Sequence, residues 1–184
     1  MRELIADLFI SLDGFASGVN EAAFFGYFGK QLGQWVNDRL AEPQVLMMGR
    51  VTYTSLAQFS SVATDELSLR MTQLPKLVFS RTLREPLTWQ NSQLVKGSLA
   101  DEILTLKQET GEPLRCIGSI SLVKSMIQLG LVDRLRLMIF PLILGTVGKE
   151  PVFDAYLRTS LSLIDTRVLD ARIVLLEYQM LKAR

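Results

Sequence analysis

Short apolar runs alternate with longer amphipathic stretches along this chain, and that alternation limits the fold more than any other feature of the sequence. Apolar runs of strand length are typical of buried strands, whereas apolar residues spaced three or four apart are typical of helices that cover a sheet. We predict strands at 4–11, 45–48, 77–80, 93–95, 114–117, 134–140, 161–169 and 172–181. We predict helices at 28–40, 50–56, 99–109 and 119–129.

The strand–helix–strand order predicts a largely parallel sheet with helices on both faces. The C-terminal pair of strands breaks this order, because only Leu169-Asp170-Ala171 separates them. We therefore expect an antiparallel hairpin at one edge of the sheet. The expected fold class is α/β, a three-layer α/β/α mixed sheet that is mostly parallel. A chain of 184 residues suits one domain, residues 1–184.

The composition excludes several classes of function. With 20 basic and 19 acidic residues, the chain has a net charge of +1, which predicts neither a nucleic-acid nor a membrane partner. The most apolar run, 137–144, is too short to span a membrane. The run 4–10 contains Asp7 and is interpreted as a strand rather than a signal peptide. The single cysteine, Cys116, cannot form an internal disulfide, which favours a reducing cytoplasm.

The sequence contains no histidine, and this absence narrows the possible chemistry. It excludes Ser-His-Asp and Cys-His triads and imidazole zinc sites, and we predict no metal site. Any reaction must therefore use carboxylates, Lys, Arg, Tyr, backbone groups or a cofactor.

Small residues stand where two predicted strands meet predicted helices. Gly49 ends one strand and Arg50-Val51-Thr52 opens the next helix, and Gly118-Ser119 leads into Ile120-Ser121 in the same way. Helix N-termini carry unpaired N–H groups and a partial positive charge, so they favour phosphate. Glycine lets a ligand approach the backbone, and Arg50 can pair with phosphate through two N–H groups. The alternative is an ordinary loop glycine, a solvated arginine and a capping serine.

A third turn, Ser80-Arg81, follows the strand 77–80 and places a hydroxyl and a guanidinium at its carboxyl end. Ligands bind at this edge in open α/β sheets. Two arginines on neighbouring turns, Arg50 and Arg81, suit the 2′-phosphate of NADP, although a surface arginine is the alternative for either one. The G-x-G-x-x-G and G-x-x-x-x-G-K-[ST] motifs are absent, which disfavours a typical Rossmann domain or P-loop NTPase.

Six short segments occur in a particular order along the chain. They are Ser11-Leu12-Asp13-Gly14-Phe15, Met48-Gly49-Arg50-Val51-Thr52-Tyr53, Val78-Phe79-Ser80-Arg81-Thr82-Leu83, Ile117-Gly118-Ser119, Gly130-Leu131-Val132-Asp133-Arg134-Leu135 and Pro141-Leu142-Ile143-Leu144-Gly145. Together they resemble the dihydrofolate reductase-like superfamily. More closely, the chain resembles the reductase domain at the C-terminus of bacterial bifunctional riboflavin-biosynthesis deaminase-reductases, and its stand-alone relatives, over residues 4–178.

The resemblance implies a dihydrofolate reductase-like sheet, an NADPH cofactor and a homodimer. It implies that the turns at 49–52 and 80–81 hold the adenosine-side phosphates. It also implies that Gly118-Ser119 lies near the pyrophosphate and the nicotinamide. The zinc deaminase half is not expected, because the chain has no H-x-E and no P-C-x-x-C motif.

The departures from the family pattern concern the substrate side. Dihydrofolate reductases carry an acid on the first helix that faces the pterin, but here the only acid is Asp38, which we expect in solvent. Ile117 stands where riboflavin-pathway reductases often have an acid. Asp13 is the best candidate for a catalytic carboxylate, and its alternative is a turn-forming Asp-Gly pair. Trp35 and the pair Phe24-Phe25 are candidates either to cover a substrate ring or to form core.

The leading hypothesis for function is hydride transfer from NADPH to a small heterocyclic or ribosylamino-pyrimidine-like substrate. Two alternatives stay open. One is an NADPH-dependent reductase of an unrelated carbonyl or imine, and the other is a non-catalytic nucleotide-binding protein.

Overall fold

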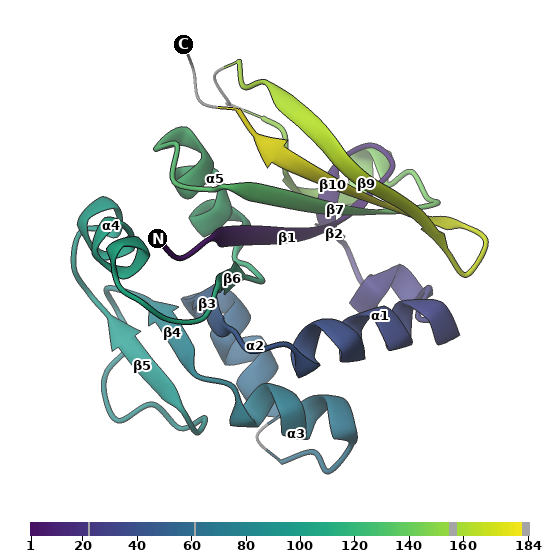
Figure 1. Cartoon of the computed structure of the whole chain (residues 1–184). Helices are drawn as coiled ribbons and strands as arrows, with labels where there is room; N and C mark the ends of the chain where they lie inside the picture. Colours follow the sequence, from purple (N-terminus) through teal and green to yellow (C-terminus); the bar gives the residue numbers. More distant parts are fainter. Residues whose placement is uncertain (22, 61, 155–157, 182–184) are drawn as a thin grey trace.

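Eight strands form one mixed sheet in the computed structural model, which describes residues 1–21, 23–60, 62–154 and 158–181 (Figure 1). Their bounds are β1 Leu4–Ser11, β3 Val45–Gly49, β4 Lys76–Phe79, β5 Ser92–Val95, β6 Leu114–Cys116, β7 Arg134–Phe140, β9 Leu161–Leu169 and β10 Ile173–Met180. The strand order is β5-β4-β3-β6-β1-β7-β10-β9. Every neighbouring pair is parallel except those of β10, which runs antiparallel to β7 and β9. The predicted parallel sheet with a C-terminal hairpin is confirmed.

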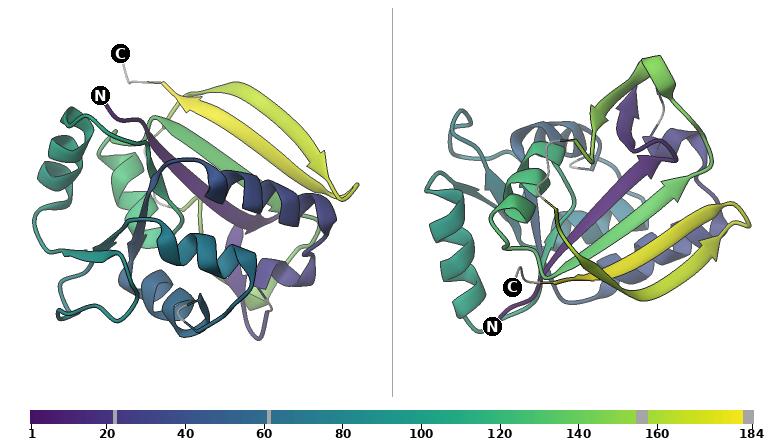
Figure 2. Two further views of the ribbon diagram at one scale, coloured as in Figure 1. Left: turned by 60° about the horizontal axis from the view of Figure 1, so that its bottom comes forward. Right: turned by 90° about the horizontal axis from the view of Figure 1, so that it is seen from above.

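Helices cover both faces of the sheet, which gives the predicted three layers (Figure 2). The α-helices of the described residues are α1 Lys30–Ala41, α2 Arg50–Ser60, α3 Glu66–Gln73, α4 Leu99–Gln108 and α5 Ile120–Gln128. Side chains of α1, α2 and α3 share one apolar cluster with one face of the sheet, and those of α4 and α5 share a second cluster with the other face. None of the helices in this part of the chain is long and apolar enough to cross a membrane.

Helix α3 was not predicted, although side chains close to it in the sequence cap both of its ends. At its N-terminus the side chain of Asp65 accepts a hydrogen bond of 3.0 Å from the N–H of Ser68. At its C-terminus the buried ammonium of Lys76 donates to the carbonyl oxygens of Met71, Thr72 and Leu74 at 3.0, 2.9 and 2.7 Å. Lys76 is the first residue of β4 and follows the helix closely in the sequence, so both caps of α3 are local.

A two-stranded ribbon and two short 3₁₀ helices were also not predicted. The ribbon pairs β2 (Phe15–Gly18) with β8 (Gly148–Pro151) in antiparallel orientation. The 3₁₀ helices are η1 (Ala23–Gly26) and η2 (Gly145–Val147). All four elements are short, and β2 meets a partner far along the chain, so neither periodicity nor a local turn indicates them.

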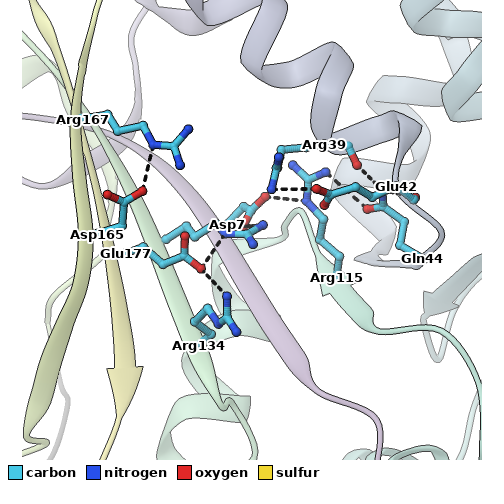
Figure 3. Close-up of polar contacts among 10 residues, drawn as sticks. Asp7, Arg39, Glu42, Gln44, Arg115, Arg134, Asp165, Arg167 and Glu177 are labelled. Atoms are coloured by element: carbon cyan, nitrogen blue, oxygen red, sulfur yellow. Dashed lines mark hydrogen bonds and ion pairs between the residues drawn. The ribbon is translucent and has the colours of Figure 1, made fainter.

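A row of buried charges crosses the centre of the sheet (Figure 3). Arg115 of β6 donates from Nε to Asp7 of β1 at 2.5 Å and from its guanidinium to Gln44 Oε1 at 3.3 Å. Arg136 of β7 lies in register with Asp7 on one side and with Glu177 of β10 on the other. Arg136 Nε lies 3.2 Å from Glu177 Oε1. These ion pairs link β6, β1, β7 and β10.

Removing the carboxylate charge of Asp7 is expected to destabilise the fold strongly. Asp7 is 6% exposed, so Asp7→Asn would leave Arg115 buried beside a neutral amide. Loss of one partner of a buried ion pair costs about 3–5 kcal/mol. Urea unfolding of the variant measures this loss.

The matched control is Asp165→Asn, which breaks an ion pair with Arg167 at the exposed edge strand β9. Exposed pairs contribute about 1 kcal/mol or less. Equal unfolding free energies for Asp7→Asn and the wild type would show that the buried row does not stabilise the sheet.

Candidate functional site

A cleft of about 640 Å³ opens at the carboxyl ends of β3, β4 and β5, beside the start of α5. Four turns contribute to it: Gly49-Arg50, Ser80-Arg81-Thr82, Lys96-Gly97-Ser98, and Ser119 with Ser121. The strand order places β5, β4, β3 and β6 side by side. Because these strands are parallel, turns that are far apart in the sequence meet at one edge of the sheet.

The charges at this cleft favour an anion. Arg50, Arg81 and Lys96 line it, and no lining residue is acidic. In the described part of the chain, none of these three cations forms an ion pair with a carboxylate. The same part of the chain holds no group of three His, Cys, Asp or Glu side chains that could bind a metal ion. The cleft therefore offers cationic groups without counterions, as a phosphate site does.

Helix N-termini add to the positive potential of the cleft. The N-cap residues of α4 and α5, Ser98 and Ser119, make no side-chain hydrogen bond to their helices. By contrast, a carboxylate caps α3, as described above, and Asp170 accepts from the first turn of α1. Ser119 is thus not an ordinary capping serine. The first turn of α5 contains no acid, and its N-cap serine makes no bond to it, which is the arrangement that binds phosphate, whereas the first turn of α4 carries Asp101 and Glu102.

Two glycines bring the turns after β3 and β6 into contact. The N–H of Gly49 donates to the carbonyl oxygen of Gly118 at 3.1 Å, and a Cβ at Gly49 would overlap the hydroxyl of Ser119. Gly118 has a φ of +131°, and a Cβ there would lie 2.6 Å from Thr52 Oγ1. Side chains at either glycine would separate the turns. Both glycines therefore allow the two turns to pack closely beside the cleft.

The structure brings most of the predicted cofactor residues together. The cleft lining includes Gly49, Arg50, Ser80, Arg81, Ser119 and Ser121. Thr52 and Gly118 form the layer beneath, where Thr52 Oγ1 donates to Ser119 Oγ at 3.4 Å. Val51 points away from the lining and is 57% exposed, and Ile120 packs against the core. The Ser80 hydroxyl accepts from the N–H groups of Thr82 and Leu83, so it also closes its own turn.

Sequence reasoning did not single out Lys96-Gly97-Ser98, although these residues line the cleft. The signal was present, because the predicted strand 93–95 and the predicted helix 99–109 flank a glycine and a serine, as at the other turns. A Cβ at Gly97 would overlap the carboxylate of Glu102 on α4. This turn contributes a third cation to the cleft.

Asp13 lies outside the cleft lining, on the turn that follows β1 at the same edge of the sheet. Its carboxylate accepts from Ser11 Oγ at 2.7 Å, from the N–H of Leu144 at 3.1 Å and from the N–H of Gly145 at 2.8 Å. The bond from Ser11 and then the two backbone bonds lower the pKa of Asp13 to about 2. The carboxylate is therefore ionised at neutral pH and joins the β1–β2 turn to η2.

The remaining candidates for the substrate side differ in how deeply they are buried. Asp38 is exposed, as predicted, and accepts from Gln34 at 2.7 Å. Trp35 is buried, with the guanidinium of Arg115 5.7 Å from its ring centroid, so it belongs to the core. Ile117 is half-buried and packs against the apolar cluster that α1, α2 and α3 share with the sheet. Phe25 is buried next to Phe140, and Phe24 is half-buried.

The strand order and the helices on both faces define an α/β domain of the dihydrofolate reductase-like fold, with a cationic cleft at one edge of its sheet. The sequence model of the RibD C-terminal domain matches residues 2–175, and the chain belongs to that family. It is 30% identical over 182 residues to the uncharacterized protein YyaP of Bacillus subtilis (strain 168), which covers 96% of this chain and 94% of YyaP.

Solved structures share the fold. A pyrimidine reductase-like protein from Corynebacterium diphtheriae superposes with a TM-score of 0.73 at 16% identity, over 99% of this chain and 93% of that protein. A diaminohydroxyphosphoribosylaminopyrimidine deaminase/5-amino-6-(5-phosphoribosylamino)uracil reductase from Thermotoga maritima superposes with a TM-score of 0.69 at 13% identity. That match covers 98% of this chain and 57% of the Thermotoga protein.

A side chain at Gly118 is expected to separate the turns after β3 and β6 and so to distort the cationic cleft. In Gly118→Val the new side chain would occupy a backbone conformation that favours glycine and would press on Thr52. Binding of inorganic pyrophosphate, measured by isothermal titration calorimetry, should weaken about tenfold or more, as expected when hydrogen bonds to a charged group are lost.

Gly130→Val is the matched control, because Gly130 also has a positive φ but follows the C-terminal end of α5, whereas the cleft lies at the N-terminal end of this helix. It should lower stability while leaving pyrophosphate binding unchanged. Unaltered pyrophosphate binding by Gly118→Val would remove this turn from the site.

Proposed function

We propose that this chain is an NADPH-dependent reductase that transfers hydride to a small heterocyclic or ribosylamino-pyrimidine-like substrate. One observation carries the proposal: in a chain of the RibD C-terminal domain family, three cations without a carboxylate partner among the described residues line one cleft, beside two helix N-termini whose N-cap serines make no side-chain bond to their helices. Of two proteins with the same fold, one is named a pyrimidine reductase-like protein and the other a 5-amino-6-(5-phosphoribosylamino)uracil reductase. The proposal treats residues 1–184 as one reductase domain that acts in the cytoplasm.

The residues of the cleft fit a dinucleotide that carries three phosphates. The first-turn N–H groups of α5, next to Gly118-Ser119, would hold the pyrophosphate. Arg50 and the Ser80-Arg81 turn would hold the 2′-phosphate, because guanidinium groups bind phosphate through paired hydrogen bonds. NADPH supplies the hydride when bound. The chain contributes binding, orientation and exclusion of water.

Asp13 is proposed to contact the substrate as an anion. Its low pKa keeps the carboxylate deprotonated at neutral pH, so it suits acceptance of a hydrogen bond rather than donation of a proton. It follows β1, the strand next to β6 in the sheet, and therefore lies on the side of Gly118-Ser119 that is away from Arg81. A nucleotide held by the cleft would direct its reactive end toward this side.

Two measurements on the purified protein test the proposal. Quenching or enhancement of NADPH fluorescence reports cofactor binding, and the loss of absorbance at the nicotinamide band reports hydride transfer to 5-amino-6-(5-phosphoribosylamino)uracil. We expect both signals. Absence of NADPH binding would contradict every reductase assignment. Binding without oxidation by this compound or by a panel of carbonyls and imines would favour a nucleotide-binding protein without catalysis.

Arginine substitutions test the assignment of the 2′-phosphate. Arg50→Ala should weaken NADPH about tenfold or more, since a hydrogen bond to a charged group contributes about 1.5–3 kcal/mol, and should weaken NADH much less. Arg81→Ala should show the same preference. Fluorescence titrations with both nucleotides measure the four affinities, and an equal loss for NADPH and NADH would reject the assignment.

We also propose that the chain forms a homodimer through the C-terminal hairpin. Large apolar side chains on the edge strand β9 are unusually exposed: Leu161 at 38%, Leu163 at 54%, Ile164 at 49% and Val168 at 61%. Contiguous apolar surface of this kind marks protein interfaces. A second copy of the same chain is the partner that the family resemblance implies.

A charge on β9 is expected to separate the subunits. Leu163→Glu places a carboxylate in the apolar surface, and sedimentation velocity should then show a monomer. Val62→Glu is the control, because Val62 is 79% exposed and lies outside the hairpin. A wild-type protein that sediments as a monomer at micromolar concentration would refute the dimer.

A further inference from the structure

Helix α1 has no N-terminal cap of its own. Its N-cap residue is Gly29, which has no side chain to accept a hydrogen bond, and its first turn contains no acid. The first residue is Lys30, whose positive charge opposes the positive end of the helix dipole. The local sequence therefore provides nothing that fixes where this helix begins.

The cap comes from the turn between β9 and β10. The Asp170 carboxylate accepts from the N–H of Gln31 at 2.9 Å and from the N–H of Leu32 at 3.1 Å. In return, the N–H of Asp170 donates to the side-chain oxygen of Gln31. This reciprocal pattern is that of a capping box, but the two partners are 139 residues apart.

Gly29 provides the space for this contact. Its φ is −120°, a conformation that any residue adopts, so the backbone there does not require glycine. A Cβ at this position, however, would overlap the carboxylate of Asp170. Glycine at position 29 therefore makes room for the Asp170 carboxylate and is not required by the backbone conformation.

The same hairpin turn also contacts the aromatic segment that precedes α1. The guanidinium of Arg172 lies 5.1 Å from the centroid of the Tyr27 ring. Upstream, Phe24 and Phe25 have φ values of +53° and +50°, which bulky side chains adopt only when their surroundings hold them there. Phe24 packs against Phe9 with ring centroids 5.3 Å apart. The start of α1 and these aromatic residues are therefore held by contacts from distant strands.

This assembly lies on the proposed substrate side of the sheet edge. Because β10 runs antiparallel to β7, the hairpin turn before it lies at the carboxyl end of β7, and β1 with Asp13 is the next strand. The cofactor cleft lies at the same edge on β3 to β6. Figures 1 and 2 show the tip of the hairpin beside the start of α1.

We propose that Asp170 is a positioning residue that fixes the substrate-side wall, formed by the start of α1 and residues 24–28. The identity of that wall rests on the proposed function, whereas the capping contact does not. Loss of the Asp170 carboxylate frees the first turn of α1 and loosens the wall. It leaves the cofactor cleft intact, because the cleft residues belong to other strands and helices.

Hydrogen exchange followed by mass spectrometry tests this inference on the full chain without a substrate. Asp170→Gly removes the carboxylate yet tolerates the left-handed φ of +50° at this position. Exchange in peptides covering 27–36 should rise about 2- to 30-fold, the range that corresponds to loss of a helix cap. Peptides covering 50–56 and 119–125 should be unchanged. Asp170→Asn keeps both an acceptor and a residue suited to this φ, so it should restore protection.

Two further variants separate the specific contact from general destabilisation. Asp65→Ala removes the equivalent cap from α3 and should raise exchange at 66–73 but not at 27–36. Gly29→Ala should reproduce the effect of Asp170→Gly, since its Cβ displaces the carboxylate. Unchanged exchange at 27–36 in both Asp170→Gly and Gly29→Ala would overturn the inference. A rise there in Asp65→Ala equal to that in Asp170→Gly would overturn it too.

Steady-state kinetics then test whether the wall acts on the substrate rather than on the cofactor. In Asp170→Gly the KM for 5-amino-6-(5-phosphoribosylamino)uracil should rise at least threefold, while the Kd for NADPH stays within about twofold of the wild type. A Kd that rises as much as the KM would show that the wall does not act on the substrate side. A wild-type chain that never oxidises NADPH would refute the proposed function, and the exchange data would still decide whether Asp170 positions α1.

Discussion

Parallel pairing of β3 with β4 on one side and β6 on the other is the constraint on which the cleft depends. Strands in a sheet lie about 4.8 Å apart, so chain segments that leave neighbouring parallel strands emerge close together. The N–H of Gly49 donates to the carbonyl oxygen of Gly118, which joins two of these segments directly. Since neither residue has a side chain, Ser119 and Thr52 fit against them and the two turns pack closely. Arg50, Arg81 and Lys96 add positive charge to the cleft at this edge.

The ends of the helices decide where an anion can bind. Carboxylates occupy the N-termini of α1 and α3, where Asp170 and Asp65 satisfy first-turn N–H groups. The N-cap serines of α4 and α5, which both begin at the cleft, make no such hydrogen bond, and the first turn of α5 contains no acid. Beneath this edge, the buried pair of Arg115 and Asp7 joins β6 to β1, a few residues before Gly118. The sheet therefore combines buried ion pairs in its interior with one edge at which Arg50, Arg81 and Lys96 have no carboxylate partner among the described residues.

The sequence predicts those features that depend on local periodicity. Alternating strand and helix patterns predicted the parallel sheet, the C-terminal hairpin and the turns that contain Gly49, Ser80 and Gly118. The Asp170 cap of α1 joins distant segments and left no such pattern, whereas α3 was missed although Asp65 and Lys76, which cap its two ends, are close to it in the sequence. Lys96 was missed although its turn carried the same strand–glycine–helix signal. For Asp13, the structure shows a carboxylate that joins two turns, and its contact with substrate stays a prediction.

A crystal structure of the protein grown with NADPH tests the central claim most directly, namely that the cationic edge of the sheet holds a phosphorylated dinucleotide. The account predicts electron density for the pyrophosphate against Gly118-Ser119 and the start of α5, and for the 2′-phosphate within hydrogen-bond distance of Arg50 or Arg81. It also predicts that the nicotinamide lies toward β1 and Asp13. A nucleotide bound elsewhere, or a cleft that stays empty at saturating NADPH, would contradict it.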